Sequence, residues 1–79
     1  MSATDLVGHA QALVDGNDYL TLGTTSADGQ PWATPVFFAA NGLRTFYWIS
    51  SPEAQHSRNL EERERVSLVI FDSTVFASR

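Results

Sequence analysis

The chain of 79 residues is 43% hydrophobic and 18% charged, which suffices for one small core and is too little for two. It contains no cysteine and only two histidines, which excludes disulfides, thiolate zinc sites and thiol nucleophiles and leaves too few ligands for a metal cage. Nine acidic against five basic residues give a net charge of -4, which argues against a nucleic acid or an anionic membrane as the partner.

The amino-terminal segment is predicted to be a helix. Four apolar residues recur at helical spacing and share one face: Leu6, Ala10, Leu13 and Val14. Ser2 or Thr4 is placed to cap the start, and Gly16 with Asn17 is expected to end the helix.

Two strands joined by a tight turn are predicted next. Tyr19 to Thr25 alternates with period two, and the turn at Ala27 to Gly29 contains an Asp-Gly pair that tolerates positive φ angles. Trp32 to Ala40 continues as a strand that is apolar on both faces, so both faces should be covered in the folded protein. Pro35 lacks an N–H group, which places it at a sheet edge or a bulge, next to free backbone groups.

The second half of the chain is predicted to add a strand, a helix and two further strands. Asn41-Gly42 predicts a hairpin into a strand over Leu43 to Ile49. Ser51, with proline at the first helical position and Glu53 behind it, predicts the start of a helix that runs to about Glu62. Strands are expected over Arg65 to Phe71 and Thr74 to Ser78. The fold class is therefore mainly β (α+β): one domain over residues 1–79 with an antiparallel sheet that curls toward a barrel and two short helices.

The start of the second helix is the best anion site that the residues themselves predict. Free N–H groups, the helix dipole and the hydroxyls of Ser50 and Ser51 are expected to converge there. Two alternatives stay open: Ser51 only caps the helix, and His56 is either a donor to the anion or a surface histidine.

A set of short motifs resembles the pyridoxamine 5'-phosphate oxidase-like, FMN-binding split barrel family. The motifs are Leu22-Gly23-Thr24-Thr25, the run from Asp28 to Phe38, Asn59-Leu60, and Arg65-Val66-Ser67-Leu68. The resemblance implies an antiparallel split β-barrel homodimer with FMN at each subunit interface. Members of this family are nearly twice as long, so the chain is expected to be an incomplete barrel that lacks the closing strands.

The resemblance also implies positions for the cofactor. Ser50 matches a hydroxyl that holds the flavin phosphate, and Gln55 with His56 occupy the two positions where the family favours lysine or arginine. Ring contacts in this family come from the second strand, which implies Thr34, Pro35 and Val36 here.

The sequence contains no recognisable nucleophile with a neighbouring base, no paired carboxylates and no metal motif, so any catalysis must come from a cofactor. The leading hypothesis is an FMN-binding oxidoreductase that transfers hydride through the flavin. The alternatives are a cofactor-free paralogue or fragment that acts only as a dimerising module, and a deazaflavin or heme binder on the same fold.

We further expect a homodimer, because a second copy would supply the core that one short chain lacks. The amino terminus has no signal-peptide pattern and no apolar run approaches the ~20 residues that span a bilayer, so the expected location is the cytoplasm, away from any membrane.

Overall fold

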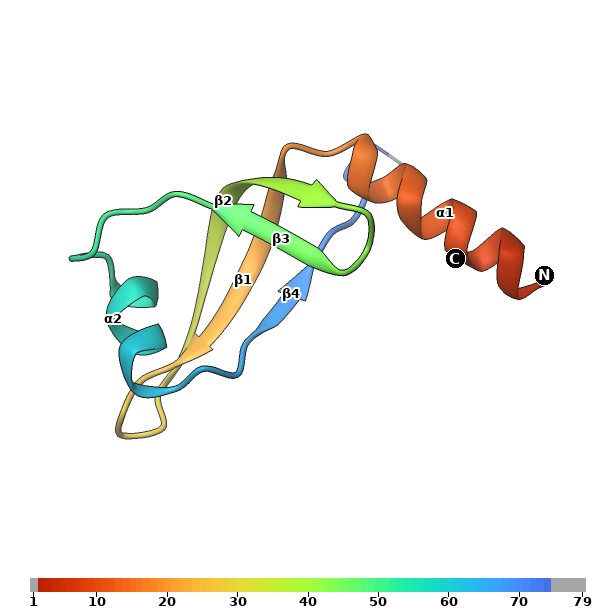
Figure 1. The fold of residues 1–79 in the computed structure, drawn as a ribbon. Helices are drawn as coiled ribbons and strands as arrows, with labels where there is room; N and C mark the ends of the chain where they lie inside the picture. The colour runs from red at the N-terminus through yellow and green to blue at the C-terminus, as the bar shows by residue number, and fades with distance from the viewer. Residues whose placement is uncertain (1, 75–79) are drawn as a thin grey trace.

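The computed structural model describes residues 2–74 and contains two helices and four strands. In chain order these are α1 (Ala3–Asp15), β1 (Tyr19–Thr25), β2 (Pro31–Asn41), β3 (Thr45–Trp48), α2 (Gln55–Glu62) and β4 (Ser67–Val69). The predicted order of elements is confirmed as far as β4 (Figure 1). The predicted fifth strand lies outside the described residues except for Thr74.

The strands form one antiparallel sheet in the order β3-β2-β1-β4. The central pair is β1 and β2, whose register places Tyr19 opposite Phe37 and Thr25 opposite Pro31. The prediction of a mainly β, antiparallel fold with two helices is confirmed, and within residues 2–74 the sheet is open and does not close into a barrel.

Helix α1 is capped as the sequence indicates. The Ser2 hydroxyl accepts a hydrogen bond from the Asp5 amide at 3.2 Å, and the Asp5 carboxylate accepts one from the Ser2 amide at 3.2 Å, which together form a capping box. At the other end, the Gly16 amide donates to the Ala12 carbonyl at 3.0 Å. No described helix is long and apolar enough to cross a bilayer.

The strands that follow the second hairpin are shorter than predicted. Asn41 lies opposite Thr45, so the connection is a loop of Gly42 to Arg44 rather than a two-residue turn, with Gly42 at φ 63°. The strand predicted over Leu43 to Ile49 therefore begins only at Thr45. β4 is limited to Ser67–Val69 because it pairs only with Thr21 to Gly23 of β1.

The core lies on one face of the sheet, called the inner face below. It contains Leu20, Leu22, Val36 and Phe38. Helix α2 packs against this face at one end of β1 and β2. Because side chains alternate along a strand, the neighbouring residues project from the opposite, outer face. There Tyr19 is 62% and Phe37 63% exposed. The prediction that both faces of the second strand are covered therefore holds for only one face within a single chain.

Candidate functional site

Helix α2 begins later than the sequence predicts. It starts at Gln55 with Ala54 as its N-cap, whereas Pro52 to Ala54 belong to a turn. In that turn the Ser51 hydroxyl accepts a hydrogen bond from the Glu53 amide at 3.2 Å, and the Ala54 amide donates to the Ser51 carbonyl at 3.1 Å. Serine favours such local bonds to the backbone. The predictions that Ser51 caps the helix and that Pro52 opens it are therefore wrong.

The start of α2 nevertheless keeps the features of an anion site. Ala54 has no side-chain acceptor, and no side-chain hydrogen bond caps the helix. The first helical hydrogen bond runs from the Arg58 amide to the Ala54 carbonyl at 3.1 Å. The amides of Gln55, His56 and Ser57 therefore have no carbonyl acceptor within the helix, and they lie at the positive end of its dipole.

Ser50 reaches this helix start although Ser51 does not. Its hydroxyl lies 2.9 Å from the hydroxyl of Ser57, and both side chains are partly buried. The sequence pattern does not single out Ser57, because it predicts a helix that begins three residues earlier and so misplaces the first turn. One hydroxyl donates to the other, so the pair keeps one hydroxyl hydrogen to donate beside the uncapped amides.

His56 lies in the first turn of α2 and is buried, with 7% of its surface exposed. Its Nε2 atom has no hydrogen-bond partner among the described residues. The alternative of a surface histidine is therefore wrong. A buried ring nitrogen without a partner is costly and uncommon, so this atom is suited to a ligand that reaches it.

Gln55 is committed to bonds within its own helix. Its Nε2 donates to Asn59 Oδ1 at 2.8 Å, and its Oε1 accepts from Arg58 Nη2 at 2.8 Å. Asn59, which is 2% exposed, donates in turn to the Thr24 hydroxyl at 2.9 Å. This chain of bonds fixes α2 on β1, so Gln55 helps to orient the helix and its side chain is less free to bind an anion.

The predicted ring-contact residues of β2 do not share one face. Val36 is 6% exposed and lies in the core, whereas Pro35 is exposed on the outer face. Thr34 is partly buried on the inner face, and its hydroxyl has no partner among the described residues. The three residues are consecutive in β2, so they share one stretch of backbone.

That backbone has an unpaired edge. The Phe38 amide donates to the Asp18 carbonyl at 2.9 Å, so alternate residues of β2 starting from Phe38 bond toward β1. Ala33, Pro35 and Phe37 therefore direct their backbone groups away from β1. β3 pairs only with Phe38 to Asn41, so no described strand meets this stretch. The prediction that Pro35 lies at an edge is confirmed, and the edge position accommodates its missing N–H group.

Two hollows of the single chain include predicted site residues. Gln55 lines one of about 260 Å³ together with Asp28, Trp32 and Asn59. Pro35 lines another of about 340 Å³ on the other side of the sheet, with Tyr19 and Val69. The residues singled out from the sequence thus fall into two groups that a single chain does not enclose in one cavity.

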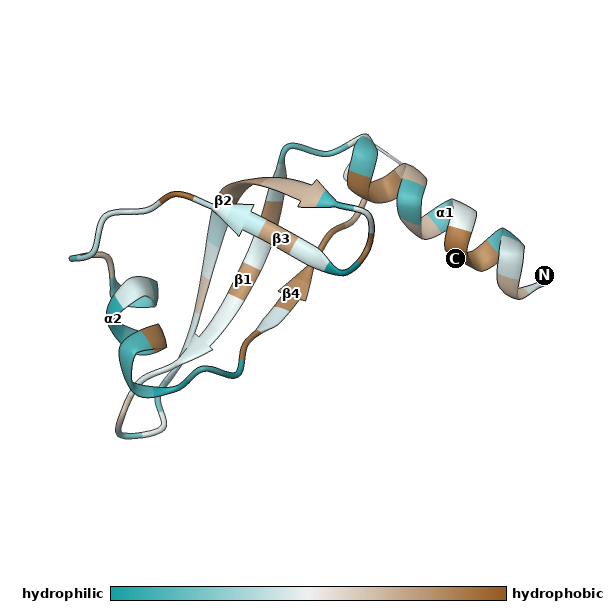
Figure 2. Cartoon of the chain, in the orientation of Figure 1, coloured by the Kyte–Doolittle hydropathy of each residue, from teal (hydrophilic) through white to brown (hydrophobic). Residues whose placement is uncertain are grey.

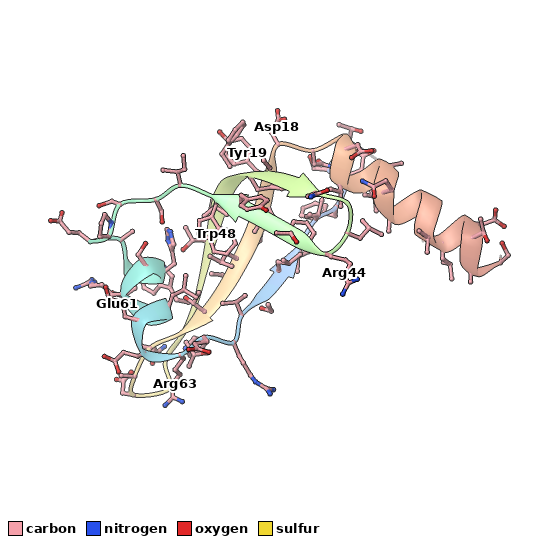
Figure 3. All side chains as sticks on the ribbon, in the orientation of Figure 1. Asp18, Tyr19, Arg44, Trp48, Glu61 and Arg63 are labelled. Carbon is pink, nitrogen blue, oxygen red and sulfur yellow. The ribbon has the colours of Figure 1, made fainter. Side chains whose placement is uncertain are left out.

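The turn between β1 and β2 is tied to the end of α2. Arg63 donates to the carbonyls of Ser26 and Ala27 at 3.0 and 2.9 Å (Figure 3). Within the turn, the Ser26 hydroxyl donates to the Asp28 carboxylate. This bond, supported by the Gln30 amide, lowers the pKa of Asp28 from its ordinary value of 3.8. The turn therefore presents an ionised carboxylate beside Trp32 and Gln55.

The donor set at the start of α2 fits a phosphate group. It combines uncapped amides, the Ser50 and Ser57 hydroxyls and the unpartnered His56 Nε2. Among residues 2–74 no group of three or more histidine or acidic side chains is placed to hold a metal ion.

A protein-family model described as Pyridoxamine 5'-phosphate oxidase matches residues 6–78. No curated protein and no solved structure matches the chain.

Proposed function

The chain belongs to the pyridoxamine 5'-phosphate oxidase family, and we propose that it binds FMN between the start of α2 and the unpaired edge of β2, as an oxidoreductase of split-barrel form. Family membership supports a flavin ligand. The position is argued from the side chains and backbone groups that have no partner of their own.

The uncapped start of α2 is the observation that carries the proposal. The phosphate of FMN would accept from the amides of Gln55, His56 and Ser57 and from the Ser50 and Ser57 hydroxyls. His56 Nε2 would gain the partner that it lacks. Burial excludes water from such bonds and makes each of them count for more.

The edge of β2 would position the ring. Ala33 and Phe37 offer N–H and carbonyl groups, and Pro35 offers a carbonyl, on the side away from β1. These groups suit the alternating donors and acceptors along the rim of a planar heterocycle. A bound flavin would supply hydride transfer, and the chain's own residues bind and orient it.

The phosphate anchor is tested by comparing FMN with riboflavin in calorimetry, because the two differ only in that group. We expect the wild-type protein to bind FMN at least about tenfold more tightly, a difference of about 1.4 kcal/mol. Ser57→Ala should weaken FMN binding and leave riboflavin binding unchanged, and Thr45→Ala, which removes an exposed hydroxyl of β3, serves as the control. Equal affinity for the two ligands, or no binding of either, would overturn the proposal.

A second candidate is a cofactor-free module that acts through dimerisation. The observation in its favour concerns Gln55, which lies at a position where the family favours lysine or arginine. Its side-chain amide is hydrogen-bonded to Asn59 and Arg58. Protein that dimerises but binds neither FMN, deazaflavin nor heme would support this candidate. An absorption spectrum distinguishes the three ligands directly.

A further inference from the structure

We propose that α1 is an intersubunit arm whose apolar stripe, formed by the exposed Ala3, Leu6 and Val7 and the half-buried Ala10, docks on the outer face of the sheet of a second copy. The inference deepens the proposed homodimer by naming the surfaces that meet. It does not depend on flavin binding.

Helix α1 is well formed, but within residues 2–74 it packs little against the rest of the chain. None of its residues is buried, and Leu6 and Val7 are 56% and 57% exposed. Val14, in its last turn, is the helix residue that packs against the core. The amino-terminal turns project away from the sheet (Figure 1), and bands of α1 are coloured as hydrophobic in Figure 2. A lone helix of 13 residues is marginal in water, so α1 needs a surface to pack on.

The single chain exposes more surface than a compact monomer of its mass. A compact monomer of 8.7 kDa exposes about 4,700 Å², whereas this chain exposes 6290 Å². The excess of roughly 1,600 Å² is larger than the ~800 Å² that each partner contributes to a standard interface. The radius of gyration, 14.5 Å against about 12 Å for a compact domain of this length, reflects the same protruding shape.

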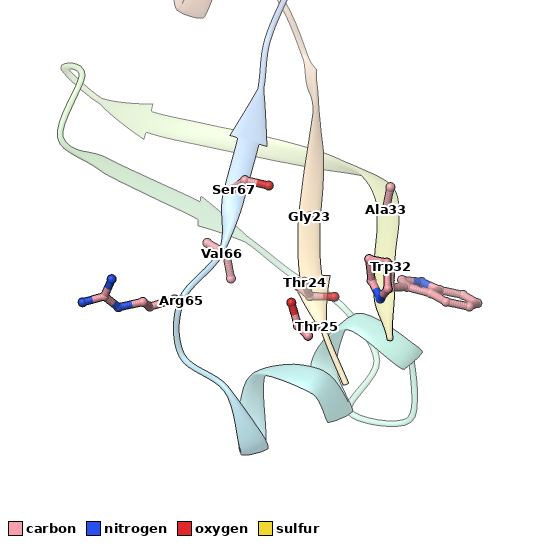
Figure 4. A pocket seen from close by; sticks show the side chains of 9 residues that line it. Gly23, Thr24, Thr25, Trp32, Ala33, Arg65, Val66 and Ser67 are labelled. Atoms are coloured by element: carbon pink, nitrogen blue, oxygen red, sulfur yellow. The ribbon is translucent and has the colours of Figure 1, made fainter. Parts of the chain in front are cut away.

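The outer face of the sheet offers a surface that matches the stripe. Tyr19 and Phe37 form an edge-to-face pair with ring centroids 5.6 Å apart. Farther along the strands, Gly23 lies between Ala33 and Ser67 in a row of small residues. This row forms part of the lining of a hollow of about 510 Å³ (Figure 4). Large side chains such as Leu6 need a recess of this kind, bounded by apolar surface.

Charge complements shape at this surface. Helix α1 carries Asp5 and Asp15 and no lysine or arginine. Arg65 lines the hollow and extends away from Thr25 in Figure 4. An acidic helix beside this arginine would be attracted to it electrostatically. The attraction would mainly fix how the two copies are oriented.

The absence of native cysteine makes disulfide trapping a clean test. Leu6→Cys and Ala33→Cys are made as separate proteins, one of them carrying a mass tag, and are mixed without flavin under mild oxidation. We expect a mixed disulfide, because the docked stripe would bring the two residues within the Cα separation of about 4.4–6.8 Å that a disulfide allows.

The matched control is Gly8→Cys, which lies about 200° around the helix from Leu6. A Cβ atom at Gly8 meets open space, so the substitution should be tolerated. Its mixed disulfide with Ala33→Cys should form at least about fivefold less readily. Equal yields for the two pairs, or no mixed disulfide with Leu6→Cys, would overturn the proposal.

Sedimentation of a Val7→Glu protein provides a second readout. We expect the monomer–dimer equilibrium to shift toward the monomer while the far-ultraviolet circular dichroism is retained. An unchanged dimer would contradict the proposed role of α1. A protein that loses the arm but still binds FMN would leave the proposed function standing. A protein with an intact arm and no affinity for FMN would refute only the function.

Discussion

At the scale of single residues, the protein relies on a few buried polar groups that connect distant parts of the chain. Asn59 joins α2 to β1 through Thr24, and both residues are almost fully buried. His56 lies one helical turn earlier with a ring nitrogen that has no partner. The hydrogen bond between Asn59 and Thr24 stabilises the fold, whereas the ring nitrogen of His56 is available for a ligand.

Asn59→Ala should destabilise the protein by about 1–3 kcal/mol, because it leaves the Thr24 hydroxyl buried without its donor. The free energy of unfolding in urea measures this loss. Gln55→Ala, which removes a less buried amide from the same chain of bonds, should cost less. Equal losses for the two variants would contradict the assignment of the buried bond as the main link.

His56→Lys should raise the affinity for FMN about tenfold, because an ammonium group is a charged donor to phosphate. Without ligand, the same variant should be less stable than the wild type, because the ammonium group would be buried without a counter-ion. Thermal unfolding with and without FMN measures both effects. A ligand-induced shift no larger than that of the wild type would place the phosphate elsewhere.

Asp28 predicts a pH dependence for the β1–β2 turn. The Ser26 hydroxyl and the Gln30 amide lower its pKa in the folded state below 3.8. Its contribution to stability is therefore present above that value and is lost as the pH falls through the lowered pKa. Asp28→Asn should be less stable than the wild type at pH 6, and the difference should vanish toward pH 2. A carboxyl titration by NMR at or above the ordinary pKa would contradict this assignment.

At the scale of elements, local sequence signals predicted β1 and α1 closely and misplaced the start of α2. The Tyr19–Thr25 strand and the Ser2 cap follow from alternation and capping chemistry, which act over a few residues. Ser51-Pro52 has an equally good helix-start pattern. The Ser51 hydroxyl instead closes a local turn. Asn59 holds the helix by a hydrogen bond to Thr24, which lies 35 residues earlier in the sequence. Such contacts cannot be read from spacing along the chain.

Ala54→Ser tests where α2 begins. A serine at the true N-cap should stabilise the protein by about 1 kcal/mol, because it supplies the missing acceptor for a first-turn amide. Chemical denaturation of this variant, compared with Ser51→Ala, locates the cap. No gain in stability from Ala54→Ser, together with a loss of about 1 kcal/mol from Ser51→Ala, would instead indicate that the helix begins at Pro52 with Ser51 as its cap.

At the scale of the whole molecule, the open sheet and the apolar outer face have one cause: a short chain can build only a small core. The sequence indicated an antiparallel sheet with a free edge, because β2 is apolar on both faces and Pro35 cannot bond in mid-sheet. Strand alternation already places Pro35 on the face opposite Thr34 and Val36. The sequence could not indicate which backbone groups of this stretch stay unpaired, because that depends on the register with β1 and on where β3 ends.

The central claim is that the start of α2 and the edge of β2 bind the same ligand. An FMN titration followed by amide NMR chemical shifts tests it most directly, since the affected backbone groups are observed one by one. The account predicts that the amides of His56 and Ser57 shift together with those of Ala33 and Phe37, at the same ligand concentrations. Shifts confined to one of the two segments, or centred on the hollow at Gly23 and Ser67, would contradict it.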